Sequence, residues 1–186
     1  TYVGGSGNDG LNQFTPLLRN YGDPFRGEII MDQAENPIVI TSTTSTNLFT
    51  TPGAVQSTFG GGLDAYLFRL DPLLTTMSWA TYYGGSGNDA GFGVQISSTG
   101  EIYATGGTQS ADLLMAGTPA SGALAGQVDG FIARFSADGS TLLSSTYLGT
   151  TEFDQSYFVQ LDTQDDVYVV GQTAGNFPIT PGKYNN

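Results

Sequence analysis

The chain of 186 residues contains no cysteine and no histidine. Without cysteine there is no disulfide and no thiolate metal site, and without histidine the commonest general base and the commonest metal ligand are missing. A Ser-His-Asp triad is therefore excluded within this chain. Glutamate is scarce as well, and none of its four residues belongs to a pair that recurs along the chain (Glu28, Glu35, Glu101 and Glu152). We accordingly predict no catalytic, cofactor-binding or metal-binding residue.

Positive charge is also scarce, because 5 Lys and Arg stand against 17 Asp and Glu and give a net charge of −12. Such a chain would repel a phosphate backbone, so we expect no nucleic-acid partner. No apolar run approaches the roughly 18 residues that a membrane span requires, so we expect no membrane insertion. The chain starts without Met and shows no signal peptide, and we interpret it as a piece of a longer protein.

Glycine, in contrast, is abundant with 27 residues, and one Gly-rich phrase recurs. It reads TYVGGSGND at 1–9, TYYGGSGND at 81–89 and, in a degraded form, TYLGTTEFD at 146–154. A shift of 65 residues aligns the last two phrases and continues without a gap, with nine identities in the thirty pairs that start at 81–110. Recurrence of this kind indicates a repeat protein.

We divide the chain into units 1–80, 81–145 and 146–186, of which the third is truncated. The first unit is longer because it carries an insertion at 10–27, which contains Arg19, Arg26 and two of the eight prolines. The insertion predicts a loop with a short helical turn at Thr15–Arg19. Insertions in single repeats often decorate a binding face.

Each unit contains short runs rich in β-branched and aromatic residues, separated by turn residues, which predicts four strands per complete unit. The predicted first strands are Glu28–Asp32, Val94–Ser97 and Phe158–Asp162, and the second strands are Ile38–Thr43, Ile102–Thr108 and Val167–Thr173. The third strands are Ala65–Leu70 and Gly130–Phe135, and the fourth are Met77–Tyr83 and Leu142–Leu148. No amphipathic helix is visible. We therefore predict an all-β chain of four-stranded antiparallel sheets, each of them one blade of a β-propeller.

The phrases TYYGGSGNDAGFGVQISSTGEIYATGGTQS and TPGAVQSTFGGGLDAYLFRLDP resemble the bacterial β-propeller repeat known as the SBBP repeat. The resemblance covers nearly the whole chain except the insertion, although the third unit has lost GGSGN. It implies a seven-bladed propeller in secreted or surface proteins of bacteria, commonly large and multidomain, and it implies no catalytic residue. The chain holds about 2.6 units, whereas propellers close with 4–8 blades, so either it is part of a larger propeller or another chain completes it.

The aspartates that end the phrases, Asp9, Asp89 and Asp154, recur at one position of the repeat. One interpretation is a Ca²⁺ site, with neighbouring carbonyl groups as co-ligands. The other is a side chain that caps backbone N–H groups in a tight turn, and we favour it because each loop offers a single carboxylate. The glycines of the phrase are turn formers, since no helix with a lysine follows them to make a phosphate site.

Asp64 and Asp129 begin the predicted third strands, with Arg69 and Arg134 five residues later. Their recurrence suggests an internal ion pair or a hydrogen-bonded strap between strands; the alternative is a ring of charged residues that binds a ligand.

Aromatic residues also recur, in two sets (Tyr2, Tyr82 and Tyr147; Tyr103 and Tyr168). Tyrosines on a propeller can stack on sugars, but we expect these to pack between blades. Trp79 does not recur, and it would be a sugar or protein contact if it were exposed near the insertion.

These observations favour a non-enzymatic module, extracellular or on the bacterial cell surface, that acts as a scaffold or adhesive domain. Its expected partners are a protein, the remaining blades of the same protein, or a polysaccharide. The alternative is a fragment of a propeller-fold polysaccharide hydrolase or lyase. A cluster of carboxylates in one concave pocket would favour the enzyme.

Overall fold

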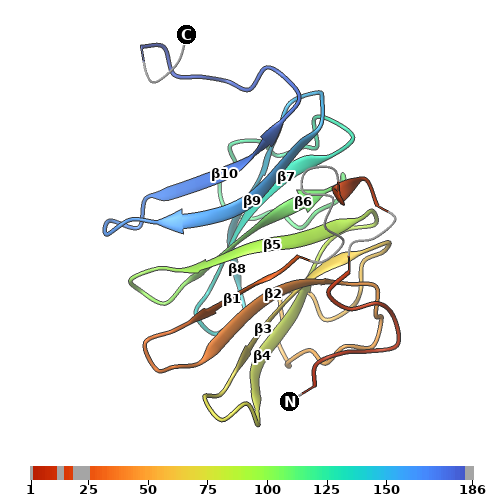
Figure 1. Ribbon diagram of the computed structural model, residues 1–186, viewed down its shortest axis with the longest axis vertical. Helices are drawn as coiled ribbons and strands as arrows, with labels where there is room; N and C mark the ends of the chain where they lie inside the picture. Colours follow the sequence, from red (N-terminus) through yellow and green to blue (C-terminus); the bar gives the residue numbers. More distant parts are fainter. Residues whose placement is uncertain (1, 12–14, 19–25, 183–186) are drawn as a thin grey trace.

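The computed structural model describes residues 2–11, 15–18 and 26–182, and this part of the chain is all-β (Figure 1). It contains ten antiparallel strands and one short 3₁₀ turn, η1 (Pro16–Leu18), but no α-helix. None of the described residues form a helix that could cross a membrane. The prediction of an all-β chain of antiparallel sheets is therefore confirmed. The helical turn predicted at Thr15–Arg19 is present in its central residues, while Arg19 lies outside the described part.

The strands form three sheets in which each strand pairs with its neighbour in sequence. The first sheet consists of β1 (Glu28–Met31), β2 (Pro37–Thr43), β3 (Asp64–Leu70) and β4 (Met77–Tyr83). The second consists of β5 (Asp89–Ile96), β6 (Ile102–Thr108), β7 (Asp129–Phe135) and β8 (Leu142–Leu148). The third consists of β9 (Asp154–Leu161) and β10 (Val167–Thr173).

The two four-stranded sheets share one register. Thr43 lies opposite Asp64 in the first sheet, and Thr108 lies opposite Asp129 in the second, each pair being 65 residues from its counterpart. Both sheets also carry an irregularity at the same place, next to the arginine of the third strand. The sequence repeat is therefore a repeat of strand pairing as well as of residue type.

The first strands of the second and third sheets begin earlier than predicted. β5 and β9 start at the phrase aspartate, five and four residues before the predicted starts at Val94 and Phe158. In β5 the glycines mark a close approach and not a turn, because a Cβ at Gly91 would lie 2.6 Å from Cγ1 of Ile40 in the first sheet. A glycine in a strand interior often has this role.

The sheets follow one another along the long axis of the molecule (Figure 1). β5 lies against β1, β2 and β3 of the first sheet, and β9 lies against β5, β6 and β7 of the second. Burial of apolar surface between the sheets is the main source of stability in such an arrangement. The largest core lies between the first and second sheets and includes Ile38, Ile40, Leu67, Val94, Ala104 and Phe131.

The Gly-rich phrase connects the fourth strand of one sheet with the first strand of the next. Two isolated parallel bridges tie it to the loop before the third strand of the preceding sheet, between Leu63 and Asn88 and between Val128 and Phe153. The phrase is thus the joint between neighbouring sheets, and the candidate residues of the sequence lie around it.

Candidate functional site

The phrase aspartate holds its own loop in place. In the second phrase, Oδ2 of Asp89 accepts hydrogen bonds from the Gly85 N–H at 2.7 Å and from Oγ of Ser110 at 2.6 Å. The hydroxyl of Thr108, at the end of β6, donates to Oδ1. Three donors therefore converge on one buried carboxylate, and they come from the loop and from the neighbouring strand.

The other two phrases repeat this arrangement. The N–H of Gly5 donates to Asp9 Oδ2 at 2.8 Å, and the Thr43 hydroxyl donates to Oδ1 at 2.6 Å. In the degraded phrase, both the N–H and the hydroxyl of Thr150 donate to Asp154 Oδ2. The three carboxylates thus cap backbone N–H groups, as the structural interpretation predicts. The described residues contain no group of three or more acidic side chains placed to hold a metal ion.

The arginines of the third strands form ion pairs, but not with the aspartates that recur beside them. Arg69 pairs with Asp32 in the β1–β2 turn, and Arg134 pairs with Glu101, which precedes β6. Nε of Arg134 donates to Oε2 of Glu101 at 2.8 Å. Each arginine therefore ties the end of its third strand to the first hairpin of the same sheet, and no ring of unpaired charges forms among these residues.

Asp64 lies instead at the joint between the first and second sheets, where it is 0% exposed. Its Oδ2 accepts hydrogen bonds from the Gly60 N–H at 2.8 Å and from Nε2 of Gln56 at 3.0 Å. Burial raises the pKa of Asp64 to about 7, and the charge of Asp89 adds to the increase, although the nearby N–H groups of Gly60 and Gly61 oppose it. A carboxyl group sealed in this way is not accessible to a substrate.

Asp129 takes the equivalent place between the second and third sheets. It is also 0% exposed, and it accepts hydrogen bonds from the N–H groups of Ala125 at 2.7 Å and Gly126 at 3.1 Å. Burial raises the pKa of Asp129, and the charge of Asp154 acts in the same direction. The sequence interpretation missed this pairing of aspartates across sheets, although their constant spacing was a signal for it.

Two of the recurring tyrosines are buried. Tyr82 and Tyr147 are each 1% exposed, and their hydroxyls donate to the carbonyl groups of Ser45 and Ser110, both at 2.8 Å. These tyrosines fix the loop that follows the second strand of each sheet. They are therefore parts of the scaffold and not surfaces for stacking on a sugar.

The remaining aromatic candidates divide between core and surface. Tyr103 is buried, whereas Tyr2 and Tyr168 are exposed. Trp79 is buried in the core between the first and second sheets, where its ring lies under Gly139 of the β7–β8 turn. Trp79 is thus not available as a ligand contact near the insertion.

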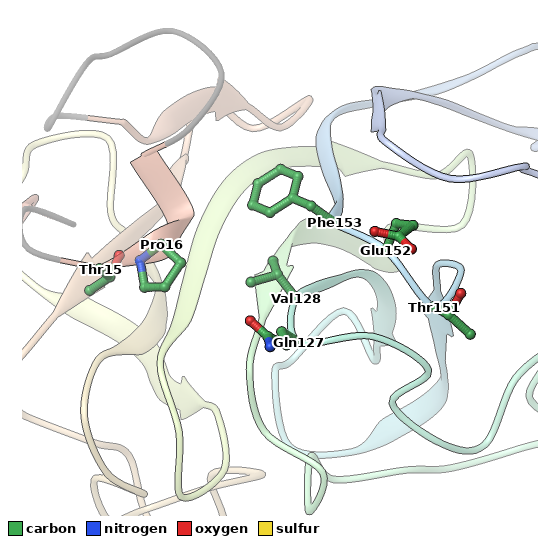
Figure 2. Close-up of a pocket in the computed structure, with 7 residues that line it drawn as sticks. All are labelled: Thr15, Pro16, Gln127, Val128, Thr151, Glu152 and Phe153. Atoms are coloured by element: carbon green, nitrogen blue, oxygen red, sulfur yellow. The ribbon is translucent and has the colours of Figure 1, made fainter.

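A pocket of about 530 Å³ lies where the insertion meets the joint between the second and third sheets. Figure 2 shows Thr15 and Pro16 of the insertion on one side and five residues of the joint on the other. The pocket is lined by Thr15, Pro16, Gln127, Val128, Thr151, Glu152 and Phe153. Its hydroxyl, amide and carboxylate groups stand beside a proline ring and a mostly buried phenylalanine, a combination that is typical of recognition sites.

Leu17 anchors the described part of the insertion beside this pocket. Leu17 is 2% exposed in a cluster with Val128 and Phe153, and its carbonyl accepts a hydrogen bond from Nε2 of Gln155 at 3.0 Å. Glu152 is the ionisable residue of the lining and is exposed. The sequence indicated an insertion of the kind that often decorates a binding face, but no local pattern identified the residues of the sheets that meet it.

Arg26 anchors the other end of the insertion, directly before β1. Its guanidinium lies 4.6 Å from the ring centroid of Phe158 and 5.2 Å from that of Tyr157, and Nη2 donates to the Tyr157 carbonyl at 3.3 Å. Stacking of a guanidinium on aromatic rings is a favourable contact. The insertion is therefore fixed to the third sheet at two points.

Comparison of the chain with models of known protein families found no match, and a search of curated proteins gave no significant match. The resemblance to the SBBP repeat accordingly depends on the phrases of this sequence.

Proposed function

We propose that this chain is a non-enzymatic β-propeller repeat module, extracellular or on the bacterial cell surface. In this proposal its sheets are consecutive blades of a larger propeller, and it acts as a scaffold or adhesive domain for a protein or a polysaccharide. Two features support the blade assignment. The second and third strands of the first two sheets share one register, and the pairing of Thr173 with Asp154 in the third sheet matches that of Thr108 with Asp89 in the second.

The observation that supports the binding role is the place where the insertion contacts the sheets. The insertion is the part of the chain that departs from the repeat, and two of its described residues, Leu17 and Arg26, contact the third sheet. Between it and the sheets lies the pocket lined by polar groups and two apolar rings. A rigid scaffold that positions one variable loop is a common design of binding proteins.

The polysaccharide hydrolase gains no specific support from the described residues. Hydrolysis of a glycosidic bond usually needs two facing carboxyl groups that the substrate can reach. The pocket lining contains one carboxylate, that of Glu152, while the pair formed by Asp64 and Asp89 is sealed inside the joint.

A glycan array and a panel of extracellular-matrix proteins, probed with the purified chain, would test the proposal. We expect binding that falls about tenfold or more in Gln127→Ala and Glu152→Ala, because each removes a polar contact from the pocket. Asp166→Asn, an exposed change at the β9–β10 turn, is the matched control and should bind as the parent does. Absence of binding across both panels would contradict the adhesive role, and release of reducing sugar ends would favour the hydrolase.

A further inference from the structure

Each joint between neighbouring sheets buries a pair of aspartates from different sheets. Asp64 begins β3 in the first sheet, and Asp89 begins β5 in the second. The same spacing of 25 residues recurs in Asp129 and Asp154, at the starts of β7 and β9. All four side chains are at most 1% exposed. Because the pair recurs, it is a property of the joint and not of one loop.

The two carboxylates of the first pair meet at Gly84. A Cβ built on this glycine would lie 2.5 Å from Asp64 Oδ1 and 3.0 Å from Asp89 Oδ2, so only a residue without a side chain fits between them. Both hydrogen bonds to Asp64 go to its Oδ2, and no hydrogen bond from the described residues reaches Oδ1. Asp89 receives three donors. Of the two, Asp64 is therefore less well prepared to hold a negative charge.

Among the residues that the structure describes, no cation acts on either carboxylate. The titratable groups that act on either carboxylate are all acidic or phenolic, and they come from β4, β5, β8 and the loop after β6: Tyr82, Tyr83, Asp89, Asp112, Tyr147 and Asp64 itself. Ionising both of two buried carboxyl groups without a nearby cation costs much free energy, so one of them usually keeps its proton.

We propose that Asp64 carries this proton in the folded protein at mildly acidic pH and loses it near neutrality. The joint between the first and second sheets is then more stable in mild acid than at neutral pH. Folding then takes up a proton from solvent between the unfolded value, near 3.8, and the folded value of about 7. The stability that the protonated pair contributes is complete in acid, decreases as the pH rises through this interval and stays low above it.

A proton fits this site better than a metal ion. The groups that point at the pair all act as donors here: they are the N–H groups of Gly60 and Gly85, the amide of Gln56 and the hydroxyls of Thr108 and Ser110. A calcium ion requires six to eight oxygen ligands. The described surroundings of Asp64 and Asp89 instead suit a pair of carboxyl groups that shares one negative charge.

The titration of Asp64 can be followed directly in the intact chain by the carboxyl ¹³C shift, with through-bond assignment on the unsubstituted protein. We expect a midpoint about three pH units above that of an ordinary aspartate. A midpoint below about 5 would overturn the proposal, and this measurement does not depend on a variant that folds.

Thermal unfolding of Asp64→Asn tests the effect on stability. Between about pH 5.5 and 8, the Tm of the parent should fall by about 4–8 °C more than that of the variant. Asp166→Asn is the control and should behave as the parent. Asp129→Asn should flatten the profile less, because both oxygens of Asp129 already accept N–H groups. Equal profiles for the parent and Asp64→Asn would contradict the proposal.

Calcium separates a proton site from a cation site. At about pH 8, millimolar CaCl₂ should leave the Tm of the parent unchanged, since the joint offers too few free oxygen atoms. An increase in Tm that Asp64→Asn abolishes would show that a cation, and not a proton, neutralises the pair.

Discussion

At the scale of single residues, the aspartates and tyrosines that recur in this chain bond to the backbone of loops. Asp89 closes the Gly-rich phrase, and Tyr147 both donates to the Ser110 carbonyl and accepts a hydrogen bond from the Leu113 N–H at 3.2 Å. A buried loop must satisfy its backbone groups in this way, because water cannot reach them. These side chains therefore supply the hydrogen bonds that water would otherwise make to the loop backbone.

Removal of one such hydroxyl should destabilise the fold. In Tyr147→Phe, the Ser110 carbonyl and the Leu113 N–H lose their partner inside the protein, and we expect the free energy of unfolding to decrease by about 1–3 kcal/mol in urea titration. Tyr168→Phe is the matched control, because that tyrosine is exposed, and it should change stability by less than about 0.5 kcal/mol. Equal effects of the two substitutions would show that burial of the hydroxyl is unimportant.

At the scale of elements, the β7–β8 hairpin of the second sheet packs against β4 of the first. Tyr83 lies between Phe131 and Phe135, with ring centroids 5.3 and 5.4 Å apart, and the Trp79 ring lies under the β7–β8 turn. At that turn Gly139 has φ +68°, a left-handed conformation in which a side chain is strained. This glycine therefore serves the turn and the contact between sheets together.

A double-mutant cycle should separate these two roles. Gly139→Ala adds a Cβ that would lie 2.6 Å from Cδ2 of Trp79, and we expect a cost of about 2–4 kcal/mol from strain and overpacking. In a Trp79→Leu background the steric part should be relieved, so the same substitution should cost about 1 kcal/mol. Urea unfolding of the four proteins measures the coupling, and additive effects would mean that the two sheets do not interact here.

At the scale of the whole molecule, the net charge of −12 opposes compaction. Arg69 and Arg134 are paired within their own sheets, so these two cations do little to bridge the acidic surface. Long-range repulsion between exposed carboxylates is weakened by salt.

We therefore expect NaCl to stabilise the chain. The Tm should rise by several degrees between about 20 mM and 0.5 M NaCl, because the Debye length shrinks below the spacing of surface charges. Asp166→Lys, which replaces one exposed acid by a base, should reduce this gain. A decrease of Tm with salt in differential scanning fluorimetry would indicate that the ion pairs contribute more than the repulsion.

Much of the fold was predictable because it depends on short-range patterns. Short runs of strand-forming residues between turns predicted the fourth strands, Met77–Tyr83 and Leu142–Leu148, with their observed bounds. The capping role of Asp89 was likewise predictable from its turn. The early start of β5 was not, because its glycines resemble a loop until the close approach of Ile40 is known.

The amino-acid sequence by itself determined the repeat, the strand order and the aspartates that close each phrase, since all of these arise from interactions within one period of the chain. Only the tertiary structure decided that Trp79 is buried, that Leu17 seats the insertion, and that Asp64 faces Asp89 across Gly84. These contacts join residues of different units, and packing between sheets, which no local pattern encodes, brings them together.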